Sequence, residues 1–175
     1  MPLNREQKEV VVAEVAAVAK KAYSAVAAEY RGLSVAELTE LRVKAREAGV
    51  YVRVVKNSLA RRAVEDTDFA CMQEGMKGPL ILAFSQQDPG SAARVIKEFA
   101  KGREKMVVRM VSIGGRVLPA SQLDVVASMP TYDQALSMLL ALMKAPVEKL
   151  ARTLNEVPGK FVRTVAAIRD AKEAA

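Results

Sequence analysis

Histidine and tryptophan are absent from this sequence of 175 residues, and cysteine occurs once. Without histidine, the chain lacks the side chain that most often acts as a general base near neutral pH or as an imidazole ligand to a metal. One cysteine permits neither an internal disulfide nor a cysteine zinc cage, which indicates a reducing compartment. We therefore expect no catalytic residue, no metal and no cofactor, and we expect Cys71 to be an ordinary buried or half-buried thiol.

Aromatic residues and long apolar runs are also scarce. Aromatic residues form only 5% of the sequence, and this composition fits contacts with the backbone and shape of folded RNA better than base stacking. Charged residues interrupt the apolar residues between Arg5 and Glu14, so the N-terminus predicts neither a signal peptide nor a membrane span. We expect a cytoplasmic protein with no membrane partner and no small-molecule substrate.

The glycine pair Gly114-Gly115 does not have the pattern of a nucleotide-binding loop. It lacks the glycine spacing and the Lys-Ser or Lys-Thr of a P-loop, and it follows a predicted strand without opening a helix. A tight turn explains the pair.

Positive charge, by contrast, is abundant and locally concentrated. Lys and Arg number 27 against 20 Asp and Glu, and the net charge of +7 favours an anionic partner such as RNA, DNA or a lipid surface. Between Arg42 and Arg62 there are seven cations and one anion. A solvated basic surface is one interpretation of such a cluster, and an RNA-binding surface is the other.

The position of this cluster favours RNA. Lys56 leaves a predicted strand, and the next two residues open a helix whose free backbone N–H groups can hold a phosphate. Further cations follow one turn later, and another lies at the turn before the second helix. The predicted RNA-binding residues are Arg31, Gly32, Arg53, Lys56, Asn57, Ser58, Arg61 and Arg62.

Helix and strand patterns alternate over residues 1–130. Capping boxes at Asn4 and Ser34 begin helices over 4–20 and 34–48, and Asn57 or Ser58 caps a short helix to about Glu65. Asp88-Pro89 is typical of the start of a helix, which would run to about Lys101. A last helix over 119–128 begins at Pro119. The β-branched and apolar runs predict strands over 50–55, 78–84 and 106–113, whereas 22–30 fits either a helix or a buried strand.

This order predicts an α/β (α+β) sandwich of the split βαβ or ferredoxin-like kind, with an N-terminal helix, over residues 1–130. A small doubly wound sheet is the alternative, and the sequence does not settle the order of the strands. Residues 131–175 form a second region, an extended helical spine that Thr131 and Gln134 cap.

The spine carries an apolar stripe that repeats at a constant interval. The period of 11 corresponds to about 3.67 residues per turn, so a nearly straight helix holds all three units on one face. Pro146 and Pro158 should bend or interrupt the helix. Because a single helix cannot bury its own stripe, we expect external partners to cover it, although packing against the chain's own first domain is the alternative. The units are Leu139, Met143 and Pro146, then Leu150, Leu154 and Val157, then Phe161, Val165 and Ile168.

A basic RNA- or DNA-binding regulator with a homodimerising C-terminal helix is the alternative function. A two-stranded coiled coil needs a sustained period of about 3.5 residues, whereas this stripe follows longer blocks with prolines between them. The period therefore favours repeated partners over a second copy of the chain.

Many stretches of the sequence resemble, in the same order, the bacterial large-subunit ribosomal protein ten family, the base of the ribosomal stalk. The resemblance covers almost the whole chain. The stretches are 29–34, 39–50, 53–63, 78–79, 93–94, 99–101, 119–123, 129–132 and 163–172.

The resemblance implies a scaffold without an active site. It implies that the N-terminal domain binds large-subunit rRNA at the GTPase-associated centre, beside ribosomal protein eleven. The C-terminal helix would anchor two or three dimers of the acidic stalk protein, ribosomal protein twelve, which recruit GTP-bound translation factors. The family also implies repression of the protein's own message. This chain departs from the family pattern by an extra copy at 149–158, which leaves the number of dimers open.

Overall fold

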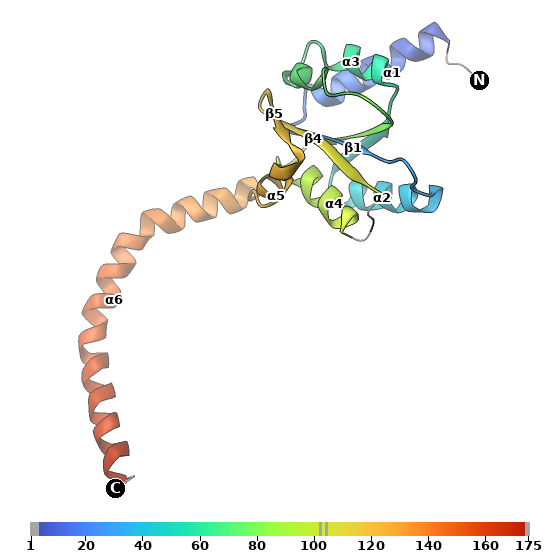
Figure 1. Ribbon diagram of the computed structural model, residues 1–175. Helices are drawn as coiled ribbons and strands as arrows, with labels where there is room; N and C mark the ends of the chain where they lie inside the picture. Colours follow the sequence, from blue (N-terminus) through green and yellow to red (C-terminus); the bar gives the residue numbers. More distant parts are fainter. Residues whose placement is uncertain (1–3, 102, 104, 174–175) are drawn as a thin grey trace. The chain divides into compact units, whose positions relative to one another are not determined.

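The computed structural model describes residues 4–101, 103 and 105–173, and the chain divides into two compact units, Met1–Thr131 and Tyr132–Ala175 (Figure 1). The first unit contains a five-stranded sheet with helices on both faces, and the second is one long helix.

Every neighbouring pair of strands in the sheet is antiparallel. The strand order is β2-β3-β1-β4-β5, so β3 lies between β1 and β2, which therefore run in the same direction. This arrangement confirms the split βαβ prediction, and the doubly wound alternative is wrong because no parallel strands pair among the described residues. The strands are β1 (Ser24–Glu29), β2 (Val50–Val54), β3 (Leu80–Ser85), β4 (Val107–Ile113) and β5 (Arg116–Pro119).

The ambiguous segment at 22–30 contains the central strand β1. Helices cover both faces of this strand, and its small side chains let those helices approach the sheet closely. Ala25 and Ala27 face one helical layer, and Val26 and Ala28 face the other. All four are almost fully buried, which explains why the segment shows no alternation of apolar and polar residues.

Two helical layers complete the first unit (Figure 1). One layer consists of α1 (Arg5–Ala19), α3 (Asn57–Val64) and the short 3₁₀ helix η1 (Asp68–Met72). The other layer consists of α2 (Val35–Glu47), α4 (Ser91–Ala100) and α5 (Leu123–Ala127), with the 3₁₀ turn η2 (Ala120–Gln122) before α5. Phe69 of η1 packs edge to face on Phe84 of β3, with ring centroids 5.9 Å apart, which anchors the first layer to the sheet.

The capping boxes at Asn4 and Ser34 are confirmed, since both reciprocal hydrogen bonds are present at each helix start. The expected caps of two other helices are wrong. The cap residue of α3 is Lys56, because the Asn57 side chain instead donates to the carbonyl of Gly78 at 2.8 Å. The cap residue of α4 is Gly90, which places Asp88 and Pro89 in the preceding turn.

The Gly114-Gly115 pair forms the turn of a hairpin between β4 and β5, as expected of a tight turn. Both glycines adopt positive φ angles, 54° and 78°, which favour glycine. The strand β5 was not predicted, because its four residues contain a proline and are largely exposed. Pro119 therefore ends a strand, and the helical segment begins at Ala120 instead of at the proline.

The second unit is the helix α6 (Tyr132–Glu173), 42 residues long. It passes through Pro146 and Pro158 without a break, so the predicted interruption is absent, and Figure 1 shows it as one curved helix. Each proline lacks an N–H for the carbonyl four residues earlier. Leu142 and Leu154, the residues that carry these carbonyls, are exposed, so water can take the missing hydrogen bonds.

Candidate rRNA interface and partner-binding helix

One edge of the sheet gathers four cations from different parts of the chain. Glu29 at the end of β1 pairs with Leu80 at the start of β3, and Val54 at the end of β2 pairs with Ile81. The turns that adjoin these strand ends therefore lie at the same edge of the sheet. We call the exposed cations of these turns the basic edge: Arg31, Lys56, Lys77 and Lys105.

The strand-to-helix junction at Lys56 lies in the middle of the basic edge. No side chain caps the N-terminus of α3, so the backbone N–H groups of Asn57 and Ser58 lie at an open helix end. Together with Tyr30 and Gly78, this junction lines a hollow of about 380 Å³. The site thus combines side-chain cations with backbone donors, as a phosphate-binding surface requires.

The turn after β1 brings Arg31 and Gly32 to the same edge. Gly32 has a φ of +91°, which L side chains rarely adopt, and a Cβ atom there would lie 3.4 Å from Cδ of Lys105. The close approach of Lys105 to this turn brings a cation that the sequence analysis missed. Lys77, which was missed too, precedes β3. Only the strand order places these two lysines beside Arg31 and Lys56, and no local sequence pattern predicts that the four cations lie together.

Arg53 is held by residues within the domain. Its guanidinium forms an ion pair with Glu14 of α1 and donates to the Tyr51 hydroxyl at 2.9 Å. The Tyr51 hydroxyl in turn donates to Glu14 at 3.0 Å. The hydrogen bond from Arg53, followed by that from Tyr51, lowers the pKa of Glu14 below its ordinary value, and the same pairing raises the pKa of Arg53. This cluster joins α1 to β2.

Glu14→Gln should lower the melting temperature at pH 7 by a few degrees at most, because solvent still reaches the pair, whose side chains are 33% exposed at Arg53 and 47% exposed at Glu14. Because the pKa of Glu14 is lower in the folded state than in the unfolded state, its ionised form stabilises the fold at pH values above the ordinary glutamate pKa. This stabilisation is lost as the pH falls through the folded-state pKa. The difference in melting temperature from the wild type should therefore shrink below about pH 4. Glu6→Gln, in the same helix but without an ion pair among the described residues, should show no such trend in a thermal melt series.

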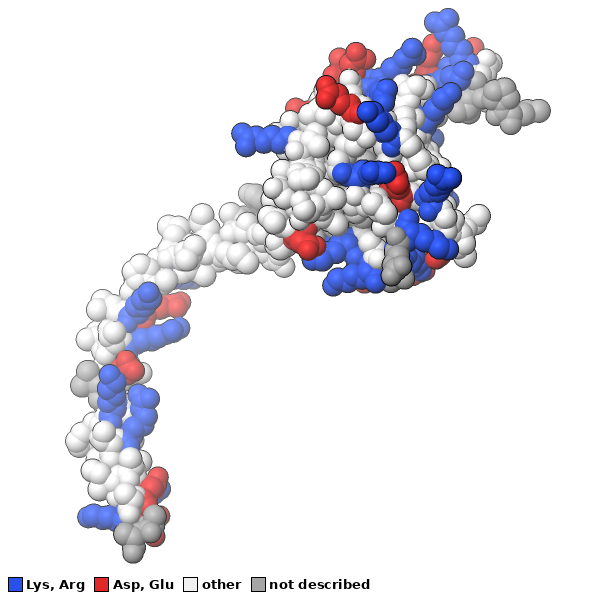
Figure 2. Space-filling view, in the orientation of Figure 1, with Lys and Arg blue, Asp and Glu red and all other residues white. Residues whose placement is uncertain are grey.

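Arg61 and Arg62 point to different places. Arg61 donates to the carbonyl of Met76 at 2.7 Å, which fixes it beside the segment that leads to Lys77. Arg62 is exposed and lines a hollow with residues of α1. Neighbouring residues of a helix point about 100° apart. Arg61 therefore adds positive charge on the side of Lys77, and Arg62 adds it on the side of α1. Figure 2 shows Lys and Arg side chains spread over the visible face of this unit.

Cys71 is exposed, so the expectation of a buried or half-buried thiol is wrong. In η1, Phe69 and Met72 face the core, whereas Cys71 is exposed as a residue, and its sulfur lies 3.4 Å from the hydroxyl of the buried Ser112. The described residues contain no cluster of three or more histidine, cysteine or acidic side chains that could hold a metal ion.

Cys71→Ser should preserve binding of RNA and of protein partners, since the thiol lies outside both candidate surfaces. A maleimide should label the folded wild-type protein without denaturant, because Cys71 is an exposed residue. Labelling that required unfolding would contradict the exposed position, and loss of binding in a folded serine variant would contradict the structural interpretation.

In α6 the repeated stripe lies on one side of the helix. With about 100° of rotation per residue, the stripe positions fall within an arc of about 100°. Leu150, Leu154 and Phe161 are 62%, 69% and 70% exposed. In Figure 2 most charged side chains of α6 lie along one side of the helix and uncharged ones along the other. No described helix is both long and apolar enough for a transmembrane segment.

The second and third units also share a hydrogen bond from a threonine hydroxyl to a backbone carbonyl. Thr153 donates to the carbonyl of Leu150 at 2.8 Å, and Thr164 donates to the carbonyl of Phe161 at the same distance. The two threonines are separated by the period of the stripe, as are the two acceptors, so the repeat in sequence is a repeat in structure. Leu139, Met143, Val165 and Ile168 are likewise exposed, whereas the side chain of Val157 lies outside the described part of the structure.

Comparison with known proteins identifies relatives over the whole chain. The family model described as Ribosomal protein L10 matches residues 3–101, and that of the Ribosomal protein uL10 C-terminal region matches residues 129–157. The large ribosomal subunit protein uL10 of Thioalkalivibrio sulfidiphilus is 69% identical over 174 residues, covering 99% of each chain. Those of Alkalilimnicola ehrlichii and Halorhodospira halophila are 63% and 62% identical over 100% of each chain.

Proposed function

This chain belongs to the ribosomal protein L10 family and is a structural component of the large ribosomal subunit, and we propose that its two units bind two kinds of partner there. The globular region, residues 1–130, binds large-subunit rRNA at the GTPase-associated centre beside ribosomal protein eleven. The helical region, residues 131–175, anchors dimers of the acidic stalk protein, ribosomal protein twelve. The chain is not an enzyme.

The basic edge supports the RNA-binding part of this proposal. Arg31, Lys56, Lys77 and Lys105 converge from four turns onto one sheet edge, beside the open N-terminus of α3. Contacts from cations and backbone N–H groups to phosphates position a protein on folded RNA without the aromatic platforms that this chain lacks. A leader in the protein's own message that mimics the rRNA site would bind the same surface, which would account for autorepression.

The uncovered stripe of α6 supports the anchoring part. Three units of exposed apolar side chains repeat at a constant interval along one face of this helix, which is 42 residues long. Burying three such side chains in each unit contributes on the order of 5 kcal/mol before the costs of association. Three dimers would occupy the three units, or two dimers if the first unit packs against the chain's own globular domain.

Native mass spectrometry of reconstituted complexes tests both parts. The full chain is mixed with the rRNA segment of the GTPase-associated centre and, separately, with the acidic stalk protein. We expect a one-to-one RNA complex and a protein complex with two or three dimers. An isolated chain that forms a stable homodimer in light scattering, and that binds neither partner, would instead support the homodimerising regulator.

A further inference from the structure

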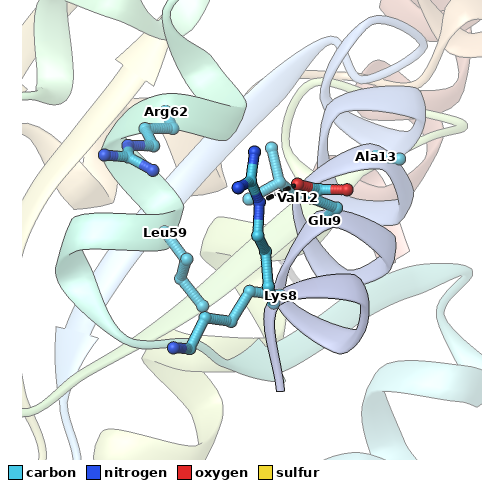
Figure 3. Close-up of a pocket in the computed structure, with 7 residues that line it drawn as sticks. Lys8, Glu9, Val12, Ala13, Leu59 and Arg62 are labelled. Atoms are coloured by element: carbon cyan, nitrogen blue, oxygen red, sulfur yellow. Dashed lines mark hydrogen bonds and ion pairs between the residues drawn. The ribbon is translucent and has the colours of Figure 1, made fainter. Parts of the chain in front are cut away.

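A hollow of about 610 Å³ lies between α1 and α3, next to the basic edge (Figure 3). Its volume is within the range of roughly 300–1,000 Å³ typical of sites for small organic groups. Lys8, Glu9 and Val12 of α1 line it opposite Leu59 and Arg62 of α3. On α1 the lining residues lie at positions i, i+3, i+4, i+7 and i+8, and on α3 at positions i and i+3, so each helix presents one face to the hollow.

The hollow has an apolar floor and a positively charged rim. Val12, Ala13 and Leu59 supply aliphatic surface, whereas Arg5, Lys8 and Arg62 supply three cations. The only acidic residue among those described that lines the hollow, Glu9, accepts a hydrogen bond from Arg5 at 3.0 Å. The net charge of the lining is therefore positive, and the expected occupant combines a flat or apolar group with negative charge.

Along α3, the lining of the hollow begins at the residue that follows the phosphate-binding junction. Ser58 lies at the open N-terminus of α3, and Leu59, the next residue, belongs to the hollow. An RNA whose phosphate is held at Ser58 would therefore have a neighbouring nucleotide within reach of the hollow. An apolar protein side chain would gain nothing from the three cations, whereas a nucleotide uses both the floor and the rim.

We propose that this hollow holds one unstacked nucleobase of the bound RNA, with the flanking phosphates on Lys8 and Arg62; this inference rests on the proposed rRNA binding. The base lies against Val12 and Leu59, and an arginine guanidinium covers one of its flat faces. Such a site needs no aromatic residue, because aliphatic side chains and guanidinium planes both pack against bases. The site adds a contact with a base to a surface whose other proposed contacts are all with phosphates.

Filling the hollow without changing its charge tests the proposal. Ala13 is exposed and lines the hollow, so Ala13→Leu places an aliphatic group there without disturbing the core. Leucine is chosen because an aromatic residue would itself stack on a base. Ala17→Leu is the matched control, since Ala17 is exposed on the same helix but does not line the hollow. A thermal melt of each variant verifies that both are folded.

Affinity is measured for the rRNA segment of the GTPase-associated centre and for a set of RNAs in which each nucleotide in turn is abasic. We expect Ala13→Leu to bind the intact RNA about tenfold more weakly with an unchanged salt slope, and Ala17→Leu to bind like the wild type. One abasic position should weaken wild-type binding by a similar factor and leave the binding of Ala13→Leu unchanged.

Two results would overturn the proposal. The first is equal affinity of Ala13→Leu and the wild type for the intact RNA. The second is an abasic scan in which every substitution affects both proteins equally. If, in the first case, Ala13→Leu also loses a neighbouring ribosomal protein, the hollow would be assigned to a protein side chain. A wild-type chain that binds no RNA would be recognised before any variant is compared, and it would refute the proposed function itself.

Discussion

Replacing Lys56, Arg61 and Arg62 together by alanine should weaken binding of the rRNA segment by on the order of tenfold or more and flatten its dependence on salt. Each phosphate contact contributes about 0.7–0.9 to the slope of log affinity against log salt concentration. Loss of three contacts should therefore reduce the slope by about 2 to 3. Filter binding or fluorescence anisotropy across a range of salt concentrations measures both quantities.

The control must remove the same charge at another place. Lys20, Lys21 and Arg116 are exposed and lie near the opposite end of the sheet, where Ser24 at the start of β1 pairs with Ile113 and Ile113 pairs with Arg116. Their triple alanine variant should keep most of the affinity and most of the slope. An equal effect of the two triple variants would mean that net charge, and not the position of Lys56, Arg61 and Arg62, determines binding.

Arg61 requires a separate variant, because its guanidinium also holds the carbonyl of Met76. Lys56→Ala with Arg62→Ala leaves this hydrogen bond intact and should reduce the slope by about 1 to 2. If only variants that lack Arg61 lose affinity, the effect arises from the segment before Lys77 and not from direct phosphate contacts. Unchanged affinity and slope in the triple variant would exclude this surface altogether.

Features that depend on neighbouring residues were predictable from the sequence. The capping boxes at Asn4 and Ser34 need only a pair of side chains three residues apart, and both are present as predicted. Prediction of the stripe of α6 needs only the period of its apolar residues. The stripe keeps this period in the structure because the helix forms without tertiary contacts. The prolines did not interrupt the helix, since the carbonyls that they leave unpaired belong to exposed residues of a solvated helix.

Features that depend on strand order were not predictable. Lys105 joins Arg31 only because β4 pairs with β1, and Lys77 joins Lys56 only because β3 pairs with β2. The same reason explains why the pairing of Arg53 with Glu14 was missed, since the two residues meet only when α1 packs over β2. The sequence thus indicated the phosphate-binding junction, whereas the extent of the basic surface required the sheet.

Leu154→Asp should remove one dimer of the acidic stalk protein from the complex and leave the other dimers bound. Leu154 is 69% exposed on the free helix and lies in the middle of the second unit, so a bound dimer would bury it. Burial of an unpaired carboxylate in that apolar interface costs more free energy than the apolar contacts of the unit contribute to binding, since burial of an isolated charge requires several kcal/mol. Native mass spectrometry should show a loss of mass equal to one dimer.

Val162→Asp is the matched control for this prediction, because it introduces the same charge at an exposed apolar residue outside the stripe. Val162 is 66% exposed, and it lies about 60° or more around the helix from the stripe positions. This variant should keep the full number of dimers. Loss of all dimers in Leu154→Asp would show that the units bind cooperatively as one site, and a single dimer on the wild-type chain would show that the repeats are not separate anchors. Loss of one dimer alone, with the control unaffected, requires that each repeated unit holds its own partner.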